Sequence, residues 1–222
     1  MKQPRPLRLS RWSFLVLLLL SFAIVGCGSR DFTETFDSSG SWGQGDDADA
    51  TGQVANGVYD MYVKSDSGLF WSTAGKSNLD MGTYELEATQ TEGPLDNGYG
   101  LIFRVDNDLS NFLLFEISSD GFVWIGWCGN GCETTAEPLV GDGWFESKAI
   151  REGLNAANNL RVVYDATGLV FSVNGQEVGS VSGVDLAGLG MGDDIGLLVE
   201  TLGHGGVRVA FDNVRYTPLV KE

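Results

Sequence analysis

Short apolar runs separated by turn signals make up most of the chain after residue 80. None of them shows the 3.6-residue periodicity of an amphipathic helix. The runs occupy residues 84–89, 101–105, 112–117, 122–127, 160–164, 169–173, 195–199 and 207–216. Turn sequences such as Asp120-Gly121 and Asn174-Gly175 lie between them, where a left-handed backbone is needed. This spacing predicts an all-β fold, an antiparallel two-sheet sandwich of the jelly-roll type.

Pairing across the turns predicts which side chains share a face of a sheet. If Asp120-Gly121 is a two-residue turn, or residues 118–121 form a four-residue one, Phe115 shares a face with Trp124, while Glu116 lies on the opposite face. A five-residue loop at 106–110 adds Val105 to the Phe115 face, which is wholly apolar and is expected to be the core. The Glu116 face is expected to be a partly open surface that bears aromatic side chains. Its principal members are Arg104, Phe112, Glu116 and Trp127.

The first 26 residues have a different pattern. Lys2, Arg5, Arg8 and Arg11 precede an apolar run at 12–25, which is shorter than the roughly 20 residues that a membrane-spanning helix needs. This order is typical of a signal peptide. The segment Ile24-Val25-Gly26-Cys27 resembles the lipobox of bacterial prolipoproteins, in which the cysteine is acylated and becomes the mature N-terminus.

The lipobox predicts three parts of the chain. Residues 1–26 are a signal peptide, residues 27–31 are a lipidated N-terminus with a short tether, and residues 32–218 are one β-sandwich domain. The membrane is then a partner through the lipid on Cys27. The predicted location is the cell envelope, outside the cytoplasm.

The mature chain is strongly acidic. Removal of residues 1–26 leaves ten basic against thirty acidic residues, a formal charge of −20. Such a surface repels nucleic acid, which is excluded as a partner. The carboxylates are also available for calcium, which is plentiful outside cells. Alternatively, the net negative charge only keeps the protein soluble.

Two cysteines remain once Cys27 carries lipid. Cys128 and Cys132 flank Gly129-Asn130-Gly131, which can form a three-residue hairpin loop with Cα atoms about 4.5 to 5.5 Å apart across its base. That separation lies within disulfide range. We therefore predict a disulfide between Cys128 and Cys132.

The order of several segments resembles the concanavalin A-like lectin and glucanase superfamily, and within it the branch around the 3-keto-disaccharide hydrolase domain. The resemblance covers nearly the whole mature chain. It rests on residues 32–37, GYGLIFRV at 98–105, NFLLFEI at 111–117, NLRV at 159–162, FSVNG at 171–175 and FDNV at 211–214. It implies a concanavalin A-like jelly roll that binds or hydrolyses glycans on its concave sheet. It also implies a structural calcium between the first and last strands, with Asp37 and Asp212 as its candidate ligands.

The catalytic pattern of the superfamily is incomplete in this chain. Laminarinase-type glucanases alternate two glutamates and an aspartate along one strand, whereas the comparable strand here keeps only Glu116. Glu87 is the candidate for a second carboxylate, and His204 is expected to be a loop residue. Residues 47–52 match part of a calcium loop, but Val58 stands where the bidentate glutamate would be.

The sequence is therefore consistent with three functions. The first is a cell-surface lipoprotein that binds a glycan or a cell-envelope polysaccharide through Arg104, Phe112, Glu116 and Trp127, without cleaving it. The second is a glycoside-active hydrolase that uses Glu116. The third is a sensory or scaffold domain whose partner is a protein.

Overall fold

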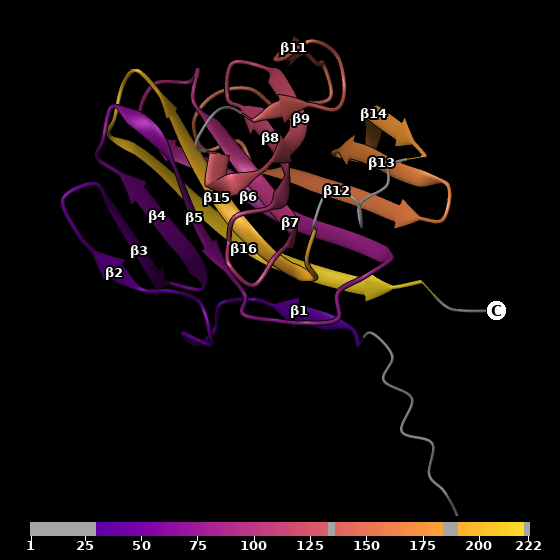
Figure 1. Ribbon diagram of the computed structural model, residues 1–222. Helices are drawn as coiled ribbons and strands as arrows, with labels where there is room; N and C mark the ends of the chain where they lie inside the picture. The colour runs from indigo at the N-terminus through magenta and orange to yellow at the C-terminus, as the bar shows by residue number, and fades with distance from the viewer. Residues whose placement is uncertain (1–29, 133–135, 184–190, 220–222) are drawn as a thin grey trace, which may run out of the picture.

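The computed structural model describes residues 30–132, 136–183 and 191–219. Two antiparallel sheets pack face to face (Figure 1). The predicted all-β jelly-roll sandwich is confirmed. Among the described residues, no helix is long and apolar enough to cross a membrane. The proposed signal peptide and Cys27 lie outside the described residues.

The first sheet, sheet A, has the strand order β14-β13-β12-β6-β16-β4-β3-β2, and β1 pairs with β16 beside this path. The bounds are β1 Phe32–Glu34, β2 Gly45–Asp46, β3 Ala50–Ala55, β4 Val58–Val63, β6 Gly82–Glu92, β12 Asn158–Asp165, β13 Gly168–Val173, β14 Gln176–Ser182 and β16 Val207–Pro218.

The second sheet, sheet B, has the order β10-β9-β8-β7-β15-β5, and β11 pairs with β9. Its strands are β5 Ser67–Thr73, β7 Gly98–Val105, β8 Phe112–Ser118, β9 Phe122–Cys128, β10 Glu137–Pro138, β11 Phe145–Glu146 and β15 Asp194–Leu202. A short 3-10 turn, η1, covers Asn130–Cys132.

The strands before β6 did not stand out in the apolar pattern. In Figure 1, β2, β3 and β4 lie at the left, at one edge of sheet A, and β5 lies at an edge of sheet B, whereas β1 lies at the bottom and pairs with β16. Gly, Ser and Asp interrupt their apolar positions, so the runs are too short to be recognised alone.

The main core lies between the sheets. Along β6, buried and half-buried residues alternate, which places Tyr84, Leu86 and Ala88 toward sheet B. From sheet B, Phe103 and Phe115 reach across to Phe171, with ring centroids 6.3 Å and 5.3 Å from it. These aromatic contacts fix the two sheets against each other.

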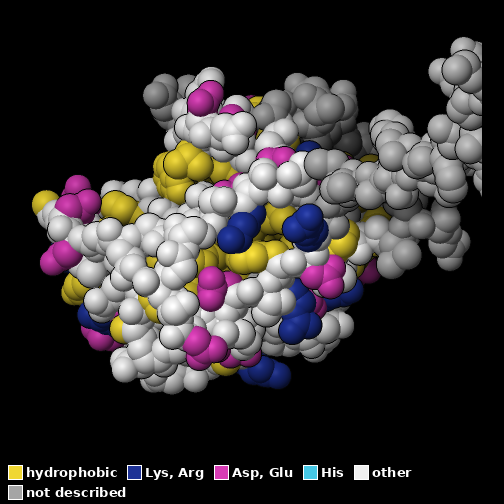
Figure 2. Space-filling model, turned by 90° about the horizontal axis from the view of Figure 1, so that it is seen from below, with side chains coloured by type: hydrophobic (Ala, Val, Ile, Leu, Met, Phe, Trp, Pro, Cys, Tyr) yellow, Lys and Arg dark blue, Asp and Glu magenta, His cyan; other side chains and the backbone are white. Residues whose placement is uncertain are grey.

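Charge is dispersed over the surface. In the view from below, acidic side chains lie scattered among polar ones, and several basic side chains lie near an apolar strip at the centre of the face (Figure 2). On sheet A, Arg208 bridges Asp60 at 2.6 Å and Glu92 at 2.9 Å. The acidic excess therefore does not by itself mark a binding site on this face.

Candidate functional site

Glu116 lies on the face of sheet B that is turned away from sheet A, here called the outer face. The strand registers form one row from Trp71 through Leu198, Gly100 and Glu116 to Trp124. A neighbouring row contains Leu69, Glu200, Gly98 and Ser118. Two carboxylates and two tryptophans are thus brought together from strands far apart in the sequence.

The outer face is packed with its own apolar side chains. Phe112 is fully buried, and its ring centroid lies 5.5 Å from that of Trp71. A second apolar cluster covers the face, and Trp71 and Trp144 are partly buried against it. Its buried members are Ile102, Val105, Phe112, Leu114, Trp124, Cys128 and Leu198. The predicted open surface is therefore largely filled, and only its margins reach solvent.

Glu116 is the buried acid of this face. Only 2% of the residue is exposed, and its Oε2 atom has no hydrogen-bond partner among the described residues. Loss of solvent raises the pKa of Glu116 well above its ordinary value, and the nearby Glu200 carboxylate raises it further. Burial also raises the pKa of Glu200, which is only partly buried. Both effects favour the neutral form of Glu116 over its carboxylate.

Gly98 makes this arrangement sterically possible. A Cβ atom at Gly98 would overlap Glu116 Oε2 and would lie 3.2 Å from the Trp144 ring. The carboxyl group and the indole therefore both lie over the glycine, and Glu200 is the strand partner of Gly98 on the other side. Trp144 comes from the segment that precedes β11 and closes the face above Glu116.

Phe112 and Glu116 share the outer face, as the sequence analysis predicted, but Trp127 does not. Three residues, 119–121, separate the paired strands, since Ile117 pairs with Val123 and Gly121 N–H donates to Ser118 O at 3.1 Å. Gly121 has φ of +100° and permits this odd-numbered loop. The loop length moves Trp127 to the main core and Trp124 to the outer face, so the assignment of Trp127 to the Glu116 face was wrong.

Arg104 has also left the predicted face. Asp194 pairs with Val105 and Ile195 pairs with Phe103, so Arg104 is the extra residue of a β-bulge and has φ of +56°. The bulge sends Val105 into the outer cluster instead of the main core. The guanidinium lies 5.6 Å from the centre of the Tyr164 ring on sheet A.

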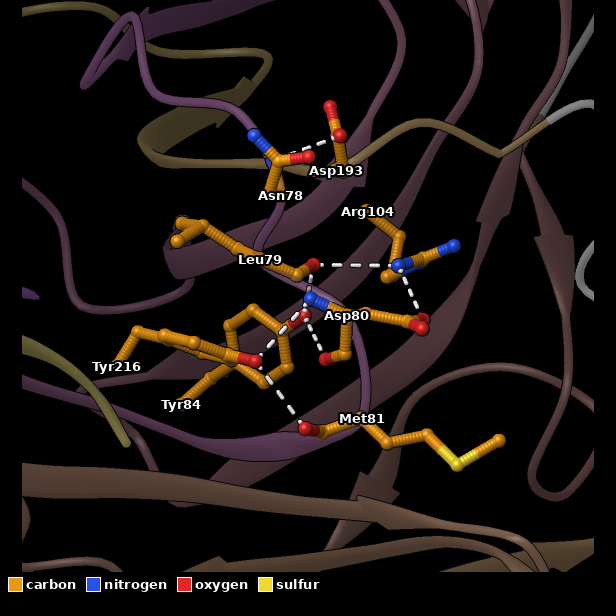
Figure 3. A network of polar contacts seen from close by, with 8 residues as sticks. All are labelled: Asn78, Leu79, Asp80, Met81, Tyr84, Arg104, Asp193 and Tyr216. Carbon is orange, nitrogen blue, oxygen red and sulfur yellow. Dashed lines mark hydrogen bonds and ion pairs between the residues drawn. The ribbon is translucent and has the colours of Figure 1, made fainter. Parts of the chain in front are cut away.

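The guanidinium of Arg104 is committed to a structural network (Figure 3). It donates to Leu79 O at 3.1 Å and to Asp80 Oδ1 at 2.9 Å. The Tyr84 hydroxyl lies 2.6 Å from the same Leu79 carbonyl, and burial raises the pKa of Tyr84 strongly. Tyr216 OH accepts from Asp80 N–H at 3.1 Å. Arg104 therefore holds the segment between β5 and β6 in place, and the saccharide-binding role predicted for it does not fit this position.

Cys128 and Cys132 form a disulfide, with Cα atoms 4.9 Å apart. The predicted hairpin is not formed. Instead, Asn130–Cys132 is a 3-10 turn, and Trp127 pairs with Glu137 in β10. The disulfide thus closes a loop at the margin of the outer face, because Cys132 packs against the same apolar cluster.

The first and last strands pair, with Phe32 opposite Tyr216 and Glu34 opposite Val214. Asp37 Oδ2 accepts from Thr35 Oγ1 at 2.9 Å, and both oxygens of Asp212 accept from Asn213. In the described part of the chain, no three His, Cys, Asp or Glu side chains are grouped to hold a metal. Calcium at Asp37 and Asp212 stays a prediction that a melting experiment with chelator would test.

The other candidate acid and base lie elsewhere. Glu87 is on β6 of sheet A and pairs with Asn159 and Asp212, so it cannot act with Glu116. His204 is an exposed residue of the loop after β15. The acid that does accompany Glu116 is Glu200, which the sequence reasoning missed. It lies in the apolar run of β15, and only the pairing of β15 with β7 brings it to Glu116.

The sequence matches no known family model and no curated protein sequence. Solved structures do match. The carbohydrate-binding module CBM66 from Bacillus subtilis is 17% identical with a TM-score of 0.59, over 81% of this chain and 98% of that chain. A Bacillus subtilis protein of unknown function with a galectin-like fold is 10% identical with a TM-score of 0.61, over 86% and 96%.

An endo-1,3-β-glucanase (laminarinase) catalytic domain from Thermotoga petrophila is 15% identical with a TM-score of 0.55, over 85% of this chain and 97% of that chain. The chain therefore shares the jelly-roll fold of these proteins, which is the fold that the resemblance in the sequence implied. At these identities the likeness concerns the fold alone. The finer resemblance to the 3-keto-disaccharide hydrolase branch stays a prediction.

Proposed function

We propose that this protein is a lipid-anchored, extracytoplasmic module that binds saccharide at the margins of the outer face of sheet B and does not hydrolyse it. The observation that carries the proposal is the placement of Trp71 and Trp144. Both are partly exposed on a largely buried face. Trp71 lies on β5, next to the strand that carries Glu200, and the Trp144 ring lies over Gly98 beside Glu116.

The chemistry of these groups suits a sugar. Indole rings offer apolar faces to the C–H surfaces of a sugar ring, and a partly exposed carboxylate such as Glu200 accepts hydrogen bonds from hydroxyl groups. Proteins with a similar fold include a carbohydrate-binding module and a laminarinase by name, which supports a glycan as the partner.

Hydrolysis is the second candidate function, and the carboxyl pair favours it. An acid with a raised pKa against a tryptophan, beside a second carboxylate, is the arrangement of a general acid in glycoside cleavage, for which the protonated glutamate of lysozyme is the standard example. Access argues against this function. A glycosidic bond must reach both carboxyl groups, which are about 5 to 5.5 Å apart in retaining enzymes, whereas Glu116 is 2% exposed beneath Trp144.

The proposed location follows from the sequence of residues 1–27. Lipid on Cys27 would place the domain close to the membrane, because only residues 28–31 precede β1. The test is fractionation and mass spectrometry of Cys27→Ser, for which loss of membrane retention or of processing is expected. Normal maturation and retention of this variant would refute the lipid anchor.

The functional test is a glycan array on the soluble chain that begins after Cys27, followed by product analysis of every glycan that binds. Binding without new reducing ends is the expected result, and Trp144→Ala should weaken it. Tyr62→Ala is the matched control, since Tyr62 is a partly exposed aromatic residue on sheet A beside Arg208. Turnover that Glu116→Gln abolishes would establish the hydrolase instead. Absence of any bound glycan would favour a protein partner.

A further inference from the structure

A cavity of about 270 Å³ opens where the edges of the two sheets meet. Its walls come from the segment before β2, from β3 and β4 of sheet A, and from β5 of sheet B. The lining residues that carry the argument are Gln44, Asp47, Thr51, Tyr59, Phe70 and Ser72. Phe70, Trp71 and Ser72 all line the cavity from β5. Because Trp71 alternates with its two neighbours along the strand, the cavity lies at the edge of sheet B, next to the outer face.

The cavity has a fixed frame of hydrogen bonds. The Tyr59 hydroxyl donates to Gly43 O at 2.5 Å, and Gly43 N–H donates to Ser72 Oγ at 3.2 Å. A Cβ atom at Gly52 would overlap the Tyr59 hydroxyl, so a glycine is needed there. The Tyr59 ring packs against Trp42, with centroids 5.9 Å apart. The two sheet edges are thus tied together around a preformed opening.

The lining combines apolar and polar groups. Phe70 and Tyr59 supply aromatic surface, while Gln44 is exposed and has no hydrogen-bond partner among the described residues. Asp47 Oδ1 accepts from the N–H groups of Asp49 and Ala50 at 2.9 Å and 2.8 Å. A compact polyhydroxylated ring fits such walls. Pockets for drug-sized ligands begin near 300 Å³, so a volume of about 270 Å³ suits one sugar ring.

The charge at the mouth selects against anions. Hydrogen bonds from Lys64 and Thr51 lower the pKa of Asp46, and backbone N–H groups lower that of Asp47. Both carboxylates are therefore ionised at neutral pH. Lys64 Nζ already contacts Asp46 Oδ1 and Asp47 O, each at 2.5 Å. An acidic sugar would meet repulsion from these carboxylates, and the described residues that line the cavity include no Lys or Arg to offset it.

We propose that this cavity is a second saccharide site, which holds a single uncharged sugar ring at the end of a glycan and rejects acidic sugars. The proposal rests on the proposed saccharide-binding function and adds an end-recognising pocket to it. The partial calcium loop of residues 47–52 is then the rim of the pocket, in which Asp47 shapes the turn and sets the charge.

The test is calorimetric titration of the soluble chain with single sugars: D-glucose, D-galactose, D-mannose, D-fructose, N-acetyl-D-glucosamine and D-glucuronate. At least one neutral sugar should bind, and D-glucuronate should not. Ala50→Leu, which extends a lining side chain of the cavity, should weaken that sugar at least tenfold. Gln44→Ala should weaken it several-fold, and as an exposed position it keeps the test valid if Ala50→Leu does not fold. Trp144→Ala should leave the single sugar unaffected.

Asp47→Asn gives the matched test of charge. It retains the Oδ1 acceptor that the turn needs and removes only the negative charge, so binding of D-glucuronate should increase several-fold relative to wild type. If no single sugar binds while longer glycans do, and Trp144→Ala weakens those glycans, the cavity site is refuted and the proposed function stands. If neither single sugars nor longer glycans bind, both proposals fall. Binding that Ala50→Leu and Gln44→Ala leave unchanged would also refute the cavity site.

Discussion

Sheet A and sheet B share one core but differ in how many of their faces are buried. Sheet A buries one face, and β6 and β4 alternate accordingly between buried and half-buried residues. Sheet B buries both faces, and all seven residues of β8 are buried. An apolar cluster covers its outer face, which a typical antiparallel sheet would expose to solvent, and Cys132, Ala136 and Trp144 pack against that cluster. The outer face of sheet B is therefore a small second core, and a ligand can contact only its margins.

The largest expected effect tests this second core. Phe112→Ala should lower the free energy of unfolding by about 3 to 5 kcal/mol, because a fully buried ring leaves a cavity. Val170→Ala, at an exposed position of sheet A, should change it by less than about 0.5 kcal/mol. Urea unfolding of both variants measures the difference. Equal, small effects would mean that the outer face of sheet B is open.

Arg104 links sheet B to the segment that leads into sheet A, so its loss tests the contact between the two sheets. Arg104→Ala should cost about 1 to 3 kcal/mol of stability, since it removes the donors to Leu79 and Asp80. Glycan affinity should be unchanged. An intact fold with lost binding would restore the role that sequence parity predicted for Arg104.

The disulfide at the margin of the outer face is expected to have an intermediate effect. Reduction of Cys128 and Cys132 removes a short covalent loop, for which the chain-entropy relation gives about 2 kcal/mol. Thermal melting with and without reductant measures it, with Cys128→Ser as the comparison. Peptide mapping that finds two free thiols in protein from the cell envelope would contradict the pairing.

The smallest effect concerns the dependence of stability on pH. Glu116 has a raised pKa in the folded state, so folding favours its neutral form. Its stabilising contribution is complete below the ordinary pKa of about 4.5 and is lost as pH rises toward the raised value. The melting temperature of Glu116→Gln relative to wild type should therefore be higher at pH 8 than at pH 4, by a few degrees. An identical difference at both pH values would mean that Glu116 ionises normally.

The fold was predictable because the apolar runs and turn signals from residue 84 onward correspond to the strands and loops of the sandwich. The outer face was less predictable, because the residues on both faces of β8 and β9 are apolar. The sequence pattern is therefore the same whichever of the two faces packs against sheet A. A three-residue loop at 119–121 and a bulge at Arg104 then decided which residues share a face. Glu200 and Trp144 join the site only through tertiary pairing, which a single sequence does not encode locally.

We propose above that a saccharide binds at the margin of the outer face, in contact with Trp144. Calorimetric titration of wild type, Trp144→Ala and Tyr62→Ala with a glycan that binds on the array tests it most directly. We expect Trp144→Ala to weaken binding by about 1 to 3 kcal/mol, roughly five- to 150-fold, and Tyr62→Ala to bind as wild type does. Unchanged affinity in a folded Trp144→Ala, or an equal loss in Tyr62→Ala, would contradict it.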